Sequence, residues 1–204
     1  QAETITTVGQ AVAYLEEQKG NFPSVKEYTE AIVETIREEC KRYQYPPPKL
    51  FIEPGRSIVN DAGNTVYTVG TIKEIPGIKK YIAVDGGMTD NPRPILYGAR
   101  YQAIVANRIH QGSPEMVSVV GKCCESGDVI IQQTEISPVQ TGDILVVEGT
   151  GAYNYSMASN YNLIPRPGVV FIRNGKPYLV VRPESWYDLV RRDILPEYLI
   201  EKGE

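Results

Sequence analysis

The sequence predicts a mainly β protein with a smaller α/β segment at its N-terminal side. Seven short β-rich runs, separated by Gly, Pro, Asp and Asn, fill most of the chain after about residue 62. Such spacing is typical of an antiparallel sandwich or barrel. The sequence before these runs has the order of elements found in an α/β unit. A strongly periodic helix comes first, and a proline-rich stop and a short apolar run follow it. We therefore predict an α/β segment of residues 1–60 and a β-domain of residues 61–204.

Residues 24–43 form the clearest predicted helix, because their apolar side chains recur on one helical stripe. Ser24 and Glu27 have the spacing of a capping box at its start. Three prolines then stop the helix, and the run "LFIEPGR" has the length of a buried strand. Because one helix and one or two strands cannot cover both faces of a parallel sheet, we expect residues 1–60 to be the end of a larger domain whose beginning is absent.

The β-rich part ends in a hairpin and a helical segment. Its runs lie at residues 65–72, 79–85, 116–122, 128–133, 143–149, 168–173 and 177–182. The last two runs meet at Asn174 and Gly175, which can supply the positive φ angles of a tight hairpin turn. Residues 184–199 are predicted to be helical and to close the chain.

Composition and charge exclude several classes of function. The 42% hydrophobic and 23% charged residues are ordinary for a folded soluble domain. A net charge of −4 gives no sign of the basic surface that nucleic-acid binding needs. No apolar run reaches the roughly 18 residues of a spanning helix, and the N-terminus lacks an export signal. Three cysteines are too few for a disulfide framework, so we predict a cytoplasmic protein with no nucleic-acid and no membrane partner.

The motif "EPGR", which comprises Glu53, Pro54, Gly55 and Arg56, ends the predicted strand. Backbone amides around a Pro-Gly turn can approach an anion closely because glycine has no side chain. Arg56 adds a fixed charge that suits a carboxylate or phosphate. An ordinary β-turn with a solvated arginine is the alternative, and the four letters alone favour it.

Residues 85–101, "DGGMTDNPRPILYGARY", form a second unusual stretch. Arg93 stands between Pro92 and Pro94, and Tyr97 follows four positions later. Prolines on both sides restrict the backbone, which can orient a guanidinium group to grip a planar carboxylate. A rigid surface loop explains the same letters equally well.

A third motif, "GKCCESGD" at residues 121–128, sets two adjacent cysteines beside a glutamate. Two cysteines and the sole histidine, His110, cannot make a four-ligand zinc site. We interpret His110 as structural, because no Ser or Asp lies at a spacing that suggests a catalytic triad. Adjacent cysteines rarely form a disulfide, because their side chains diverge. One cysteine can act as an acid while Glu125 accepts hydrogen bonds from an ammonium group. Strand alternation places Cys123 and Cys124 on opposite faces, so only one of them is expected to face the site as an acid. A buried-thiol role stays open for Cys123.

The fourth motif, residues 148–162, places three tyrosines and three asparagines around a Gly-x-Gly turn. As a dinucleotide fingerprint it is weak, because the third glycine and the βαβ setting are missing. A polar, aromatic wall of a ligand site fits these residues better.

In order and spacing, the four motifs resemble the C-terminal half of the diaminopimelate decarboxylases, which are fold-type III pyridoxal-phosphate enzymes. The resemblance covers roughly residues 50–190. It implies a C-terminal β-sandwich or barrel domain preceded by the last helix-strand units of an incomplete (β/α)8 barrel. It also implies pyridoxal 5'-phosphate as cofactor, a homodimer with shared active sites, and decarboxylation of meso-2,6-diaminopimelate to L-lysine in lysine biosynthesis.

The resemblance further implies roles for single residues. Arg56, Arg93 and Tyr97 match substrate-binding residues, with Arg93 and Tyr97 on the substrate carboxylate. Cys124 matches the proton-donating cysteine, and Glu125 matches the ligand of the distal amino group. In that family, both residues reach the active site of the neighbouring subunit. With Cys124 as the acid, Cys123 is a packing neighbour.

The same resemblance places the segment Glu53–Arg56 at the cofactor phosphate and Tyr153 in contact with both cofactor and substrate. Gly9 is the one glycine retained from a glycine-rich phosphate loop. No lysine stands in a motif that matches the cofactor-bearing lysine. We therefore expect residues 1–204 alone to lack decarboxylase activity and to form no covalent bond to the cofactor through a lysine.

Two other functions stay open at this point. The first is a sister decarboxylase of the same fold type that acts on ornithine, lysine, arginine or carboxynorspermidine. The second is a non-catalytic β-domain that dimerises with or regulates a longer relative. In the predicted β-domain of residues 61–204, the C-terminal helical segment is expected to pack back on the barrel.

Overall fold

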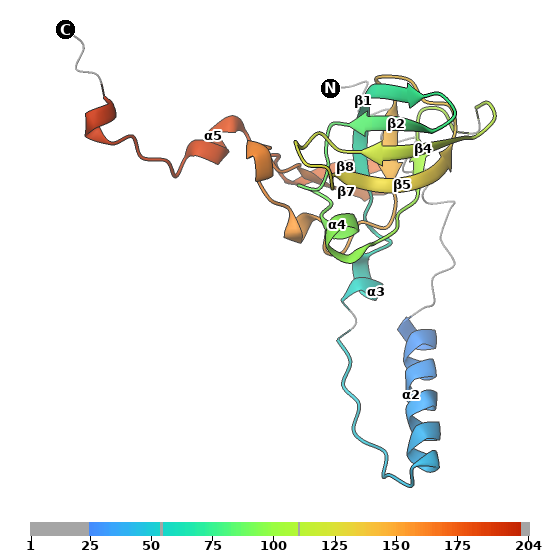
Figure 1. The fold of residues 1–204 in the computed structure, drawn as a ribbon. Helices are drawn as coiled ribbons and strands as arrows, with labels where there is room; N and C mark the ends of the chain where they lie inside the picture. The colour runs from blue at the N-terminus through green and yellow to red at the C-terminus, as the bar shows by residue number, and fades with distance from the viewer. Residues whose placement is uncertain (1–24, 54, 110, 201–204) are drawn as a thin grey trace.

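The computed structural model describes residues 25–53, 55–109 and 111–200. The predictions for Gly9, Ser24, Pro54 and His110 lie outside the described residues. The described chain forms a six-stranded sheet, a separate two-stranded hairpin and several short helices around them (Figure 1). It is mainly β, as the sequence predicts.

The six-stranded sheet curls into a nearly closed barrel. Its strands are β1 (Thr65–Ile75), β2 (Lys79–Val84), β3 (Ala103–Val105), β4 (Glu115–Val120), β5 (Val129–Ile136) and β6 (Ile144–Val147). They lie in the order β3-β6-β1-β2-β4-β5, and the two end strands, β3 and β5, contact each other. Most pairs are antiparallel, but β2 and β4 pair in parallel. Of the two predicted architectures, the barrel is therefore the one observed.

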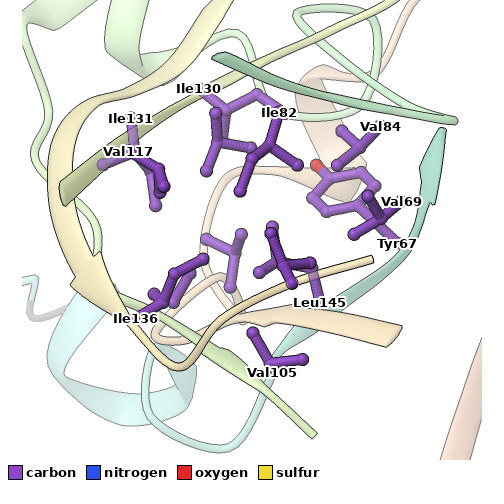
Figure 2. Close-up of a cluster of buried hydrophobic side chains, with 14 residues drawn as sticks. Tyr67, Val69, Ile82, Val84, Val105, Val117, Ile130, Ile131, Ile136 and Leu145 are labelled. Atoms are coloured by element: carbon purple, nitrogen blue, oxygen red, sulfur yellow. The ribbon is translucent and has the colours of Figure 1, made fainter. Parts of the chain in front are cut away.

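One hydrophobic core fills this barrel. Along β1, Tyr67 and Val69 are buried while Val66 and Thr68 are exposed, which is the alternation of a half-buried strand. Figure 2 shows side chains from β1, β2, β4, β5 and β6 meeting inside the sheet. The β-branched residues of the predicted runs thus form the core, because every second side chain of each strand faces inward.

The hairpin consists of β7 (Val169–Arg173) and β8 (Lys176–Val181). Asn174 has φ 51° and Gly175 has φ 70°, so the predicted turn is confirmed. The hairpin leaves large apolar side chains exposed, including Phe171 at 63% and Leu179 at 63%.

The N-terminal part matches the prediction only in its helix. Helix α2 (Val25–Arg42) confirms the predicted helix and lies apart from the barrel, to which a long extended segment connects it (Figure 1). The predicted buried strand is wrong, because residues 50–53 form no strand and Phe51 is 77% exposed. A strand is stable only when neighbours pair with its backbone, and no described residue pairs with this segment.

The C-terminal prediction is also too long. Only α5 (Trp186–Val190) and the 3-10 turn η3 (Glu197–Leu199) form within the predicted helix. Ser185 and Asp188 make a capping box that starts α5, but Pro196 interrupts the helical pattern. Trp186 is 73% exposed, so α5 lacks the tertiary packing that stabilises most helices. None of the helices in the described part of the chain has the length and apolar character needed to cross a bilayer.

Candidate active site

The turn from Glu53 to Arg56 leads into the short helix α3 (Arg56–Val59). The Gly55 amide donates a hydrogen bond to the Glu53 carbonyl oxygen at 2.8 Å. Glu53 is exposed, whereas Arg56 is half-buried. The Nη2 atom of Arg56 is buried and has no hydrogen-bond partner among the described residues. The turn is therefore more than a surface turn with a solvated arginine.

Tyr153 lies directly over this turn. A Cβ atom at Gly55 would be 2.0 Å from the Tyr153 hydroxyl oxygen, so glycine is needed where the phenol rests. Tyr153 itself has φ 62°, in the left-handed region that non-glycine residues rarely adopt. Such a conformation persists only where surrounding contacts hold it, and it often marks a functional position.

A backbone contact holds the Tyr153 loop in place. The Gly151 amide donates a hydrogen bond to the Asn60 carbonyl oxygen at 2.9 Å. A Cβ atom at Gly151 would be 1.8 Å from the Val59 carbonyl oxygen, so the two backbones touch. This contact joins the residues after α3 to the loop and sets Tyr153 over Gly55.

Arg93 begins helix α4 (Arg93–Tyr97), and Pro92 precedes it at the N-cap. The guanidinium carbon of Arg93 lies 5.0 Å from the centroid of the Tyr97 ring and 5.9 Å from that of the Tyr153 ring. The Nε atom of Arg93 is buried without a hydrogen-bond partner among the described residues. The guanidinium group thus lies near two aromatic rings, and its Nε–H donor has no partner among the described residues.

Arg56, Arg93, Tyr97 and Tyr153 form the arginine–tyrosine cluster. Buried polar groups are almost always hydrogen-bonded in folded proteins, so two unpartnered guanidinium nitrogens indicate a missing acceptor. A carboxylate or phosphate supplies oxygens at the spacing that guanidinium groups bind best. The cluster is therefore suited to an anionic ligand beside aromatic walls.

The loop before α4 is fixed by a buried carboxyl group. The Tyr67 hydroxyl donates a hydrogen bond to Asp90, and the Gly87 amide donates another at 2.8 Å. Burial raises the pKa of Asp90, although the Tyr67 and Gly87 bonds lower it. Burial, followed by the nearby charge of Asp90, raises the pKa of Tyr67 well above its usual value. These bonds anchor the α4 loop to the barrel core.

Cys123 and Cys124 lie in the turn between β4 and β5 and differ in exposure. Strand alternation does not apply here, because residues 121–128 form bends and a turn. The turn nevertheless separates the two thiols, since Cys124 is exposed and Cys123 is half-buried. The Cys124 amide donates a hydrogen bond to the Asn162 side-chain oxygen at 3.0 Å. Glu125 is exposed, and its Oε1 atom accepts a hydrogen bond from the Gly127 amide at 3.2 Å.

Asp128 controls the environment of the inner thiol. Burial raises the pKa of Cys123 to about 11, and the nearby Asp128 carboxylate adds to the effect. Cys123 therefore stays protonated near neutral pH. Cys124 is the more accessible of the two thiols.

The cysteine turn packs against the helix that carries Arg93. A Cβ atom at Gly127 would lie 2.4 Å from Ile95 Cδ1, and α4 contacts β5. Within the described residues, no hydrogen bond or ion pair joins Cys124 or Glu125 to the arginine–tyrosine cluster. The described residues also contain no group of three His, Cys, Asp or Glu residues that could hold a metal ion.

Two residues of the site were not singled out from the sequence. Asp128 and Asn162 lie in the third and fourth motifs, but their roles depend on hydrogen bonds that they accept from backbone amides. The bond to the Cys124 amide spans 38 positions. Asn162 has φ 55°, a conformation that asparagine tolerates better than most residues, and this preference was the only local signal.

Comparison with known proteins identifies the family. A model of the pyridoxal-dependent decarboxylases, specifically of their C-terminal sheet domain, matches residues 26–151, which is more than half of the chain. The chain belongs to this decarboxylase family. The resemblance drawn from the four motifs is thereby confirmed, and the barrel is the sheet domain of these enzymes.

Similar proteins in several organisms are diaminopimelate decarboxylases. The one from Bacillus subtilis (strain 168) is 54% identical over 168 residues, covering 82% of this chain and 38% of its own length. The one from Synechocystis sp. is 46% identical over 178 residues, covering 87% and 38%. The chain therefore spans less than half the length of these relatives.

Solved structures show the same likeness. Diaminopimelate decarboxylase from M. jannaschii matches with a TM-score of 0.74 and 35% identity, covering 90% of this chain and 41% of that one. A second structure, of the same enzyme with L-lysine, matches with a TM-score of 0.74 and 36% identity, covering 89% and 41%.

Proposed function

We propose that this chain is the substrate-anchoring and proton-donating part of a diaminopimelate decarboxylase. The reaction converts meso-2,6-diaminopimelate to L-lysine and carbon dioxide. The proposal rests above all on two half-buried arginines with unpartnered guanidinium nitrogens, together with an exposed cysteine–glutamate pair in a separate turn. The names of the similar proteins, and the L-lysine bound to one of them, support the same substrate class.

The substrate has a distal end that carries both a carboxylate and an ammonium group. Arg93 binds the distal carboxylate with its free Nε donor, and Tyr97 orients the guanidinium group from one side. Glu125 accepts hydrogen bonds from the distal ammonium group, for which its exposed carboxylate is available. An amino acid that lacks either group leaves one of these charges unpaired, which is the basis of selectivity.

The residues around Gly55 fit the phosphate of pyridoxal 5'-phosphate. The unpartnered Nη2 atom of Arg56 is a donor for phosphate oxygens, and Tyr153 lies against the same turn. Pyridoxal phosphate supplies, when bound, an electron sink for the carbon that loses carbon dioxide. Tyr153 and Arg56 hold the reacting end of the substrate beside it.

Cys124 delivers the proton that completes the reaction. The bond between the reacting carbon and its carboxylate breaks, carbon dioxide leaves, and a C–H bond forms with the proton from Cys124 Sγ. Solvent then returns a proton to the thiolate, which its exposure permits. A thiol suits this role because it is a weak acid that can give up a proton and take one back from solvent.

We also propose that Cys124 and Glu125 act in the active site of a second subunit. Both side chains are exposed, and within the described residues neither bonds to the arginines of its own chain. A homodimer lets the cysteine turn of one protomer reach the arginine–tyrosine cluster of its partner.

A substrate comparison in the complete protein that contains this chain tests the proposal. With pyridoxal phosphate supplied, kcat/KM for meso-2,6-diaminopimelate should exceed that for lysine by roughly 10⁴-fold, because lysine leaves the distal arginine unpaired. Glu125→Gln should lower kcat/KM for diaminopimelate by at least about tenfold, about 1.4 kcal/mol. Glu135→Gln, on an exposed position of β5, is the matched control and should change nothing. A preference for lysine would overturn the proposal.

A further inference from the structure

The Asp128 carboxylate joins two loops that are far apart in the sequence. Its Oδ1 atom accepts a hydrogen bond from the Met88 amide at 2.6 Å, and its Oδ2 atom accepts one from the Cys123 amide at 2.8 Å. The residue is only 4% exposed, so both bonds are shielded from water. The first loop leads into α4 with Arg93, and the second carries Cys124.

Glycines on both sides fit this carboxylate closely. A Cβ atom at Gly87 would lie 2.5 Å from Asp128 Oδ2, and one at Gly121 would lie 2.1 Å from the same oxygen. The Gly121 amide also donates a hydrogen bond to the Asp128 carbonyl oxygen at 2.9 Å. Both loops therefore approach the carboxylate more closely than any other residue type allows.

We infer that Asp128 is a positioning residue that fixes the Cys124 turn on the α4 loop of its own chain, and so sets where the Cys124 thiol stands in the active site of the partner subunit. Misplacement of a reacting group by about 1 Å can cost 10²-fold in rate. Only an ionised carboxylate can accept from both amides, because an asparagine side chain offers one oxygen and one N–H₂ group. Asn162 secures the next amide of the same turn, that of Cys124. The inference deepens the proposed function and rests on it for the identity of the reaction.

Asp128 also keeps the neighbouring thiol out of the chemistry. Its charge helps to hold the pKa of Cys123 at about 11, after burial as the larger cause. The same carboxylate thus fixes the backbone of Cys123 and disfavours its thiolate. This gives the inference a readout that does not depend on decarboxylation.

The test compares Asp128→Asn with Asp143→Asn in the complete protein. Asp143 is a matched control, because it is also 4% exposed and also holds a turn, accepting the Gln140 amide at 2.7 Å and bonding Arg108. Asp128→Asn should lower kcat on meso-2,6-diaminopimelate by about 10²-fold with a change in KM of less than about threefold. It should also lower the pH midpoint of Cys123 alkylation by iodoacetamide, followed by peptide mass spectrometry. Asp143→Asn should lower thermal stability and leave both quantities unchanged.

A second variant covers the case in which Asp128→Asn does not fold. Gly121→Ala keeps the carboxylate but pushes it out of place, so it should reproduce the loss of kcat. Unchanged kcat and an unchanged Cys123 profile in the Asp128 variant would overturn the inference, as would equal losses in the Asp143 control. If the wild-type protein does not decarboxylate diaminopimelate, the proposed function fails. The Cys123 alkylation midpoint then still decides whether Asp128 has the inferred contact.

Discussion

Gly55 and Gly151 lie on the two sides of the contact that places Tyr153, but they meet different kinds of atom. A Cβ atom at Gly55 would meet the far end of the Tyr153 side chain, which is 45% exposed and can swing away. A Cβ atom at Gly151 would meet the carbonyl oxygen of Val59 and the backbone of Gly63, which cannot move without displacing whole segments. An alanine substitution should therefore affect mainly activity at Gly55 and mainly stability at Gly151.

We predict that Gly55→Ala costs less than about 1 kcal/mol of stability but lowers kcat/KM at least about tenfold, because Tyr153 is displaced. Gly151→Ala should cost about 1–3 kcal/mol of stability through overpacking. Thermal unfolding and steady-state kinetics of the complete protein measure the two effects. Equal losses of stability in both variants would show that the Gly55 contact is as rigid as the backbone contact.

The unequal roles of the two adjacent cysteines could be predicted from the sequence, but the cause could not. Adjacent thiols predict unequal roles, and the structure supports this with one exposed and one half-buried side chain. The predicted cause, strand alternation, was wrong because the residues lie in a turn. The two thiols are instead placed by the buried Asp128 carboxylate, which accepts from the Cys123 amide, and by the Asn162 side-chain oxygen, which accepts from the Cys124 amide. Neither bond is visible in the local sequence pattern.

At the scale of elements, a carboxylate clip holds the segment that carries Asn162. Glu184 accepts hydrogen bonds from the Asn160 side chain at 2.6 Å and from the Arg166 amide at 2.9 Å, and it pairs with the Arg166 guanidinium group. The bonds with Arg166 lower the pKa of Glu184 to about 2. The clip ties the 3-10 turn η2 (Tyr161–Leu163) to the chain after β8.

This clip should depend on pH in a defined window. A carboxyl group with a lowered folded-state pKa contributes stability above its unfolded pKa of about 4.5 and loses it as pH falls through about 2. Hydrogen-exchange protection of the Arg166 amide in wild type should exceed that in Glu184→Gln above pH 4.5. The two proteins should converge as the pH falls toward 2. Convergence already at pH 4.5 would mean that the carboxyl group has an ordinary pKa.

Elements with strong local signals were predicted, and those that depend on distant partners were not. All seven β-rich runs form strands, because each run has β-forming residues and is bounded by turn residues. Strand β3 was missed because its three residues are too short for a period to be seen. The strand predicted at residues 50–56 failed because its apolar run needs neighbouring strands to become a buried one.

At the scale of the whole molecule, the hydrophobic core is confined to the six-stranded sheet. Among the described residues, α2, the β7–β8 hairpin and α5 contribute no side chain to the buried core. The residues of the candidate site lie on loops and on the short helices α3 and α4, and these helices lie outside the six-stranded sheet (Figure 1). A rigid barrel that presents functional loops is a common arrangement, because loops can vary without loss of the core.

The sequence predicted which residues form the candidate site, but it did not predict how they come together. Arg56, Arg93, Tyr97 and Tyr153 were all predicted, and three separate segments bring them together in the structure. Their meeting depends on the backbone contact at Gly151, which joins segments about 90 residues apart. The division of the chain near residue 60 and the homodimer stay predictions.

The central claim is that Cys124, and not its neighbour, donates the proton. Cys124→Ser and Cys123→Ser in the complete protein, assayed for carbon dioxide release from meso-2,6-diaminopimelate, test it most directly. We predict that Cys124→Ser lowers kcat by about 10²- to 10⁴-fold, as expected for loss of a general acid, while Cys123→Ser stays within about threefold of wild type. Equal rates in the two variants, or a larger loss in Cys123→Ser, would contradict the account.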